Sequence, residues 1–366
     1  MPTALLRKIS FAFLSVIAGT SHLHAQDDFT ATFDRVAARH APMALAAGYV
    51  VGQTAPVIHV AGRTRSDGGG AVAPDAPWHI GSITKSFTAT LVMQMHEAGQ
   101  IDIDVPIGAQ FPELGGQMHR DWQGLTFADL LGHAAGLPAN TDWHREDQAG
   151  QGNPTAARRA ALSALWGKPI QGKRGQFSYS NLSYVLAGYL IELRARSSWE
   201  MLVQQNIAQP LGLHSLGFGP PSGPGVAFGH RRAGLRQKPV PPTDPGADNP
   251  PVMGPAGRIH ISVPDLLKWG QAHLNACRNG GIITVASCQR MQQAGTGGMG
   301  LGWGVQNSKS GLHMVLHDGS NTRWYAFLVL VPERDAVLVV VQNDGRSLRA
   351  TKALRQLAEP LLGRLF

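Results

Sequence analysis

The segment "HIGSITKSF", residues 79–87, places a serine and a lysine three positions apart at the start of an apolar run. From this point apolar side chains recur at every fourth position: Ile83, Phe87, Leu91 and Met95. This spacing predicts a helix, and the absence of Asp, Glu, Lys and Arg from residues 86–96 predicts that the helix is buried. Lys85 therefore lies at the edge of a buried helix. A charge in such a place lowers stability, so we expect this lysine to have a function.

Ser82 and Lys85 are expected on one face of this helix, because residues three apart are neighbours. A serine hydroxyl is a weak nucleophile that needs a base, and a lysine in an apolar cleft has a lowered pKa and can take that proton. The start of a helix also offers a backbone N–H to a developing oxyanion. The S-x-x-K spacing alone is weak evidence, since an N-capping serine followed by a solvent-facing lysine has the same pattern.

Two later segments change this balance. "FSYSNLSY" places Tyr179 and Asn181 before a predicted helix, and "LHDGSNTRWY" places His317 and Gly319 at the end of a predicted strand. At this point the sequence resembles the serine β-lactamase and penicillin-binding hydrolase family, whose pattern is S-x-x-K, then Y-x-N, then K-T-G or H-x-G on a late strand. "LLGHAAGLP" and "GPAGRIHISVPDLLKW" resemble two further segments of that family, and the resemblance covers about residues 30–345.

The resemblance implies a role for each matching residue. Ser82 is the nucleophile that becomes acylated, Lys85 helps to deprotonate it, and Tyr179 passes the proton to the leaving group, as in the class C-like branch. Asn181 is expected to hydrogen-bond the substrate amide and the lysine. The backbone N–H groups of Ser82 and Ser320 are expected to form the oxyanion hole. Beside Lys85, ionised Tyr179 is expected to be more accessible than its free pKa of about 10 suggests.

The third motif departs from the β-lactamase pattern. His317 and Gly319 are expected to line the substrate site with Ser320, but His317 and Asp318 replace the lysine and threonine of K-T-G. That pair grips a carboxylate, and a mostly neutral histidine, of free pKa about 6.5, is a poorer anion site. Family members with H-x-G include esterases, broad hydrolases and some D-Ala-D-Ala carboxypeptidases. Arg323 either restores the missing positive charge or faces solvent.

Each assignment also has a purely structural interpretation. Tyr179 could be an ordinary half-buried tyrosine, Asn181 only a helix cap, and His317 a strand-end histidine bonded to backbone. The shared order and spacing of the motifs favour the catalytic interpretation. His133 is expected to lie behind the site in a structural role.

The order of predicted elements is a helix, two strands, a long helical stretch from about 99 to 287, three or four strands, and a last helix over about 347–362. Residues 217–257 are rich in proline and glycine, and we interpret them as a long surface loop rather than a linker. Strands near both chain ends suggest one sheet made from both termini.

We therefore expect an α+β, serine β-lactamase-like fold, with an antiparallel sheet built from both chain ends, flanking helices and an all-helical subdomain. One hydrolase domain is expected over residues 26–366, with its sheet part at about 26–80 and 295–366 and its helical part at about 81–294. Ser82 would then lie in the cleft between the two parts.

Residues 1–25 have the pattern of a cleavable secretory signal. Arg7 and Lys8 precede a short apolar run over 9–18, and the segment ends on the small residue Ala25. Ten apolar residues are too few to span a bilayer, so cleavage near Ala25 and a secreted or periplasmic location are expected, without stable membrane insertion.

The chain has 366 residues and a formal charge of +8. Its basic residues are scattered rather than clustered, so a solvated surface is favoured over a nucleic-acid site. Cys277 and Cys288 lie close together in the sequence, and in an exported chain they form either a local disulfide or two free buried thiols.

The leading hypothesis is an exported acyl-serine hydrolase acting on β-lactams, esters or amides such as D-amino-acid peptides of the cell wall. A D-Ala-D-Ala carboxypeptidase, a carboxylesterase, and a binding protein that kept the fold without catalysis are the alternatives. Neither a phosphate loop nor a zinc motif is found, so no cofactor and no metal are expected. The expected partner is a small-molecule or peptidoglycan-like acyl substrate.

Overall fold

The structure is a computed structural model, which describes residues 26–234, 236–308, 310–344, 351–352 and 356–357. The predicted signal peptide, residues 1–25, lies outside the described residues. Most of the predicted helix over 347–362 lies outside them as well.

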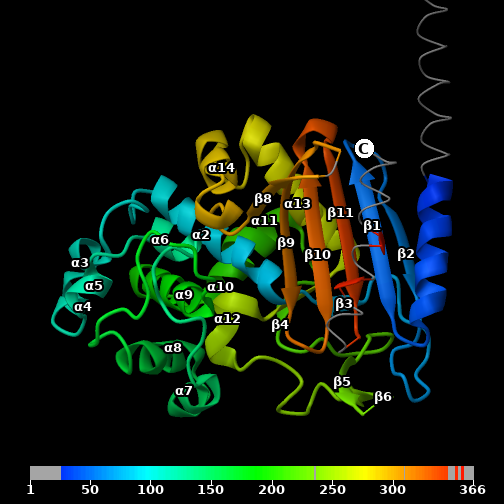
Figure 1. The fold of residues 1–366 in the computed structure, drawn as a ribbon, viewed down its shortest axis with the longest axis horizontal. Coiled ribbons are helices and arrows are strands. Elements are labelled where there is room, and N and C mark those ends of the chain that lie inside the picture. The colour runs from blue at the N-terminus through cyan, green and yellow to red at the C-terminus, as the bar shows by residue number, and fades with distance from the viewer. Residues whose placement is uncertain (1–25, 235, 309, 345–350, 353–355, 358–366) are drawn as a thin grey trace, which may run out of the picture.

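A six-stranded antiparallel sheet forms one side of the molecule (Figure 1). Its strands lie in the order β2 (Val57–Ala61), β1 (Leu45–Val51), β11 (Ala336–Gln342), β10 (Tyr325–Val331), β9 (His313–Ser320) and β8 (Gly304–Asn307). Leu45 pairs with Gln342 and Val51 with Ala336, so the first and last of these strands lie side by side. The predicted fold class, with a sheet built from both chain ends, is confirmed.

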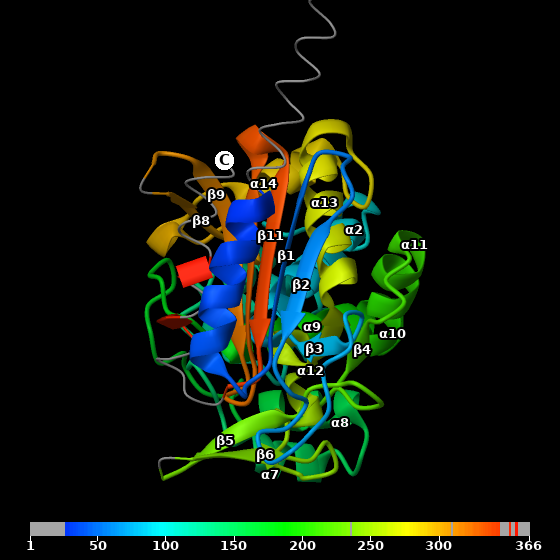
Figure 2. The same cartoon turned by 90° about the vertical axis from the view of Figure 1, so that its right-hand side faces the viewer.

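Strand β11 shows why this sheet is the centre of the fold. All seven of its residues are buried, and their side chains alternate between two hydrophobic clusters, as the two-residue period of a strand requires. Val337 and Val339 face the helical side, where α13 (Val263–Asn279) packs. Leu338 and Val340 face the other side, where Figure 2 shows the N-terminal helix over residues 26–40 lying along the sheet.

Helices fill the other side of the molecule (Figure 1). Besides α13 they are α2 (Thr84–Glu97), α3 (Ile107–Gln110), α4 (Pro112–Gly115), α5 (Arg120–Gln123), α6 (Phe127–Leu131), α7 (Trp143–Ala149), α8 (Pro154–Ser163), α9 (Asn181–Ala195), α10 (Trp199–Val203), α11 (Gln209–Leu211), α12 (Gly254–Gly257) and α14 (Val285–Gln292).

The predicted buried helix is α2. It packs against α9, α10, α12 and α14, and every residue from Thr84 to Met93 is buried. Phe87 stacks on Trp269, with ring centroids 3.9 Å apart. The Ser86 hydroxyl donates to the carbonyl of Ile83 and accepts from the indole N–H of Trp269, so the polar group is satisfied inside the core.

The prediction of only helices and loops between 99 and 287 was wrong. A three-stranded sheet joins β3 (Pro77–His79), β7 (Ile259–Ser262) and β4 (Gly217–Phe218), and β5 (Gly229–Ala233) pairs with β6 (Arg236–Val240) in a hairpin. The hairpin and β4 lie in the segment interpreted as a surface loop. These strands have two to five residues, too few to show a period among the prolines and glycines around them.

Cys277 and Cys288 form a disulfide that joins the end of α13 to α14. The sequence was compatible with either this disulfide or two free buried thiols, and the structure contains the disulfide.

Replacing both cysteines by alanine is expected to lower the free energy of unfolding by about 2–3 kcal/mol, because the bond closes a loop of 11 residues in the unfolded chain. Urea unfolding of the variant and the oxidised wild type would measure this difference. Equal midpoints and slopes would show that the bond adds nothing to stability.

Candidate active site

Two glycines bring the start of α2 against the end of β9. Gly81 opens the 3-10 turn η1 (Gly81–Ile83) at φ +50°, and a Cβ there would lie 2.2 Å from the backbone nitrogen of Ser320. A Cβ on Gly319 would lie 2.6 Å from the backbone nitrogen of Ser82. Only glycine permits this approach at both positions. The backbone nitrogens of Ser82 and Ser320 therefore belong to two segments in direct contact.

Lys85 is completely buried one turn after Ser82. Its Nζ donates to the Ser82 Oγ at 3.0 Å, to the Asn181 Oδ1 at 2.8 Å and to the carbonyl oxygen of Ala256 at 2.6 Å. Burial lowers the pKa of Lys85 from 10.5 to about 7, although the carboxylate of Asp318 raises it in part. Near neutral pH the lysine thus exists in both protonation states, as a base for Ser82 requires.

Tyr179 lies over the same lysine. Its ring centroid is 5.0 Å from the Lys85 Nζ, and its side chain hydrogen-bonds Ser82. Desolvation raises the pKa of Tyr179 well above 10, although the bond to Ser82 lowers it in part. The residue as a whole is 37% exposed, so this desolvation belongs to the hydroxyl end rather than to the ring face. This direction is opposite to the expected accessible tyrosinate, because burial of the hydroxyl outweighs the lowering effect of the bond to Ser82.

Asn181 is the first residue of α9, and the hydroxyl of Ser180 caps that helix by accepting from the Ser183 N–H. The Asn181 side chain also makes hydrogen bonds outside the helix. Oδ1 accepts from Lys85, while Nδ2 donates to the Oδ1 of Asn140 at 2.8 Å. One Nδ2 hydrogen remains for a substrate carbonyl.

His133 lies behind Tyr179, with ring centroids 4.2 Å apart. Its Nδ1 accepts from the Ser180 N–H at 3.1 Å. Burial, with the nearby charge of Lys85, lowers the pKa of His133 to about 2, so the ring is neutral. It supports the Tyr179 ring and the start of α9, in agreement with the expected structural role.

His317 is buried on β9, 5% exposed. Its Nδ1 lies 2.6 Å from the carbonyl oxygen of Asp318, and since a carbonyl only accepts, Nδ1 carries the proton. Nε2 is then an acceptor, and among the described residues it has no hydrogen-bond partner. Burial, with the charge of Lys85, lowers the pKa of His317 to about 4. The position is therefore neutral, and it suits a substrate group that donates a hydrogen bond.

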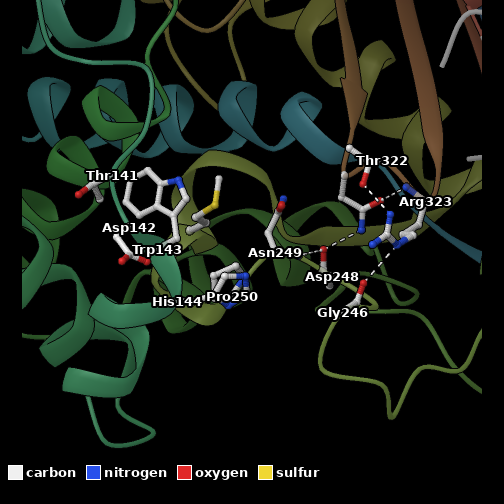
Figure 3. A pocket seen from close by; sticks show the side chains of 12 residues that line it. Thr141, Asp142, Trp143, His144, Gly246, Asp248, Asn249, Pro250, Thr322 and Arg323 are labelled. Atoms are coloured by element: carbon white, nitrogen blue, oxygen red, sulfur yellow. Dashed lines mark hydrogen bonds between the residues drawn. The ribbon is translucent and has the colours of Figure 1, made fainter. Parts of the chain in front are cut away.

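A pocket of about 310 Å³ is drawn in Figure 3. It is lined by Thr141, Asp142, Trp143, His144, Gly246, Asp248, Asn249, Pro250, Met253, Asn321, Thr322 and Arg323. The pocket does not include Ser82, but Asn321 directly follows Ser320, and Thr141 directly follows the Asn140 that bonds Asn181. The pocket is therefore lined by the segments that continue from Ser320 and from Asn140.

Arg323 forms part of the pocket wall. Its Nε donates to the carbonyl of Gly246 at 3.2 Å and its Nη1 to the Thr322 hydroxyl at 2.9 Å (Figure 3). It forms no salt bridge with any Asp or Glu of the described chain. Of the two interpretations of this arginine, a charge available at the site is favoured over one that simply faces solvent.

Several residues of the site were missed in the sequence. The carbonyl of Ala256 comes from the short helix α12 and the side chain of Asn140 from the connection between α6 and α7, and neither residue was singled out in the sequence. His79 and Asp248 were missed as well, although His79 lies only three residues before Ser82. A histidine among the apolar residues that precede Ser82 was a signal that could have found His79.

Within the described part of the chain, no group of three or more His, Cys, Asp or Glu side chains is placed to hold a metal ion. The same residues include no helix long and apolar enough to cross a bilayer.

The antiparallel sheet, the helical side and the cluster at their junction define a protein of the serine β-lactamase and penicillin-binding protein fold. The chain belongs to the Beta-lactamase family, whose model matches residues 29–361. The resemblance inferred from the motifs is thus confirmed.

Three relatives show the range of this family. Penicillin-binding protein 4 of Amycolatopsis lactamdurans is 27% identical over 360 residues, which are 94% of this chain and 90% of the relative. A D-stereospecific amidohydrolase from Streptomyces sp. matches with a TM-score of 0.69 at 23% identity, over 88% of this chain and 97% of that one. A class C β-lactamase matches with a TM-score of 0.76 at 17% identity, over 94% of this chain and 97% of that one. The chain spans about half the length of several other curated relatives.

Proposed function

We propose that this protein is an acyl-serine hydrolase with Ser82 as its nucleophile. The observation that carries the proposal is the buried Lys85, whose Nζ lies 3.0 Å from the Ser82 Oγ and whose pKa is lowered to about 7. A lysine poised between its two states beside a serine is the arrangement that activates a hydroxyl. Members of the family are serine hydrolases, which supports the same reaction class.

In the proposed reaction, neutral Lys85 accepts the hydroxyl proton of Ser82 while Oγ attacks the substrate carbonyl. The backbone N–H groups of Ser82 and Ser320 bind the resulting oxyanion. Tyr179, which stays protonated because its pKa is raised, donates its proton to the leaving group and is reprotonated from Lys85. The C–N or C–O bond then breaks, leaving an acylated Ser82 that water hydrolyses to the acid and free enzyme.

For the substrate we propose amides and esters with a peptide-like acyl part, with D-amino-acid amides as the first class to test. Asn181 and the acceptor Nε2 of His317 suit an amide's carbonyl and N–H groups. The neutral His317 favours them over β-lactams, whose carboxylate the family's lysine binds. A D-stereospecific amidohydrolase and a D-amino acid amidase among the relatives of like fold support this choice.

We also propose that the protein is exported to a secreted or periplasmic location. The signal-like residues 1–25 and the Cys277–Cys288 disulfide support this, since such bonds persist in oxidising compartments. Neither a nucleic-acid partner nor stable membrane insertion is part of the proposal.

The test is intact-protein mass spectrometry of the wild type, Ser82→Ala and Ser178→Ala after brief exposure to penicillin G, p-nitrophenyl acetate or D-phenylalanine amide. Ser178 is an exposed serine beside Tyr179 and serves as the matched control. We expect an adduct or a product burst in the wild type and Ser178→Ala, and neither in Ser82→Ala.

The reagent that turns over selects the substrate class. Turnover of D-phenylalanine amide or the ester supports the proposal, whereas efficient turnover of penicillin alone would make the protein a β-lactamase. A penicillin adduct that is never released, with no turnover of the other two reagents, would indicate a binding protein. If none of the three reagents reacted, the proposal of acyl-serine chemistry would be wrong.

The rate of acylation is expected to depend on pH through Lys85. Because the neutral amine is the active form, kcat/KM should rise about tenfold per pH unit below about 7 and level off above it. His317 titrates near 4 and would not cause this break. The measurement is the initial rate of p-nitrophenyl acetate hydrolysis between pH 5 and 9. A rate that kept rising up to pH 9 without levelling off would show that the base does not have the lowered pKa of about 7.

A further inference from the structure

Asp248 is a buried carboxylate that lines the pocket, in a long connection that the proposed reaction does not use (Figure 3). Its side chain is 4% exposed. Oδ1 accepts from the Asn249 N–H at 2.7 Å and from the Asn321 Nδ2 at 2.8 Å, and Oδ2 lies 3.4 Å from the Arg258 Nε. Although burial raises it, contacts with His79, Arg258 and Asn321 hold the pKa of Asp248 below its usual value. The carboxylate is therefore ionised.

The first link runs from Asp248 to the nucleophile. The Nε2 of His79 lies 2.8 Å from the Asp248 Oδ1, in an oblique contact where the ring N–H does not point straight along the line between the atoms. The other ring nitrogen, Nδ1, accepts from the Gly81 N–H at 3.1 Å. A backbone N–H can only donate, so Nδ1 is bare and Nε2 carries the proton that faces Asp248. The contacts from Asp248 through His79 to Gly81 therefore hold the peptide bond that precedes Ser82 in place.

The second link runs from Asp248 to the end of β9. Asn321, which binds the carboxylate, directly follows Ser320. Its Oδ1 accepts from the backbone N–H groups of Arg323 and Trp324, and this closes a turn in which Thr322 has φ +68°. A β-branched residue in that region is strained, and the surrounding bonds must hold it there.

The third link runs toward Lys85. Asn249, next to Asp248, donates its Nδ2 to the carbonyl of Gly257 at 2.9 Å. The preceding carbonyl, that of Ala256, accepts from Lys85. The residue next to Asp248 thus holds the backbone beside the carbonyl that accepts from the Lys85 amine.

We propose that Asp248 and His79 are positioning residues, which hold the backbone N–H groups of Ser82 and Ser320 at the spacing that an oxyanion requires. The inference rests on the proposed acyl-serine function and adds residues that touch neither substrate nor nucleophile. An oxyanion hole works through donors fixed before reaction, so a small displacement of either segment weakens transition-state binding more than substrate binding.

The test uses three variants of the full chain. Asp248→Asn removes the charge at nearly constant shape. His79→Gln keeps a donor near Asp248 but loses the acceptor for Gly81, whereas His79→Asn keeps an acceptor near the position of Nδ1. His260→Asn is the matched control, because His260 pairs with His79 across the same small sheet and its Nδ1 instead contacts the carbonyl of Gly219.

For each variant, kcat and KM for p-nitrophenyl acetate and the Ki of phenylboronic acid are measured, with active sites counted from the burst. A boronate forms a tetrahedral adduct whose oxygen occupies the oxyanion hole, so its Ki reports the hole itself. We expect kcat to fall about 10- to 100-fold in Asp248→Asn and His79→Gln, with KM within about threefold and Ki raised by the same factor as kcat falls. His79→Asn should recover part of the loss, and His260→Asn should stay near the wild type.

A purely structural role gives a different result. It would lower the number of active sites while the remaining sites kept a normal kcat and Ki, and this outcome would overturn the inference. Folded variants with unchanged kcat and Ki would also overturn it, while leaving the proposed function intact. A wild type without Ser82-dependent hydrolysis would overturn both.

Discussion

The Lys85→Met variant is expected to acylate Ser82 about 10³-fold more slowly than the wild type. Methionine nearly conserves the volume of the lysine stem in this closed site, so the core should remain packed. What is lost is the base at 3.0 Å from the Ser82 Oγ, and a positioned general base contributes on the order of 10²–10⁴ in rate. Stopped-flow measurement of the p-nitrophenyl acetate burst would give the acylation rate directly.

Lys268→Met is the control for this variant, because Lys268 is half exposed on α13, where it pairs with Asp265 on its own helix and donates to the carbonyl of Gly212. Its acylation rate should match the wild type. If Lys85→Met retained a rate within tenfold of the wild type, a different group would have to be the base.

Lys85→Met is also expected to change how the free energy of unfolding depends on pH. The pKa of Lys85 is about 7 in the folded protein and 10.5 as its ordinary value, so between these limits the unfolded chain binds more protons. The free energy of unfolding contributed by this group therefore rises with pH from about 7 to 10.5, by at most about 5 kcal/mol. Lys85→Met lacks this contribution. Its stability relative to the wild type should be greatest below pH 7 and fall above it, as urea unfolding at pH 6, 8 and 10 would show.

The second large effect is expected from Gly319→Ala. The new Cβ would lie 2.0 Å from the carbonyl oxygen of Ile80 and 2.6 Å from the backbone nitrogen of Ser82. Both contacts are with backbone, so β9 and η1 must move apart. Since the two proposed oxyanion donors belong to these segments, kcat should fall by about 10²-fold or more, and the free energy of unfolding by about 1–3 kcal/mol.

Gly115→Ala provides the comparison, because a Cβ at the end of α4 would meet no atom within 4 Å. It should leave kcat unchanged. Wild-type activity in Gly319→Ala would show that the donors do not come from these two segments, or that their spacing is unimportant.

The sequence was most informative where short-range pattern determines structure. The uncharged run after Ser82 predicted a buried helix, because a helix that is apolar all round needs a dry environment on every side. The strands near the C-terminus were found because their apolar runs are short and are separated by turns. The burial of Lys85 followed from its neighbours, since the lysine shares their helix.

The sequence was least informative where contact joins distant segments. Asp248 meets His79 and Asn321 only after three separate connections have folded together, and no local period encodes that meeting. The ionisation of Tyr179 was misjudged for a related reason. The nearby lysine is visible in a motif, but the desolvation that raises the pKa of Tyr179 depends on packing by the whole site.

The pairing of β1 with β11 also dictates the order in which this molecule can be completed. During synthesis β1 emerges early and must wait for β10 and β11, made nearly three hundred residues later, before it has a neighbour on that side. Contacts so distant along the chain make folding slow, and the helices made in between cannot close the cleft until the final strands arrive. A ribosome-bound chain of this topology thus stays unfinished until its last strand is made.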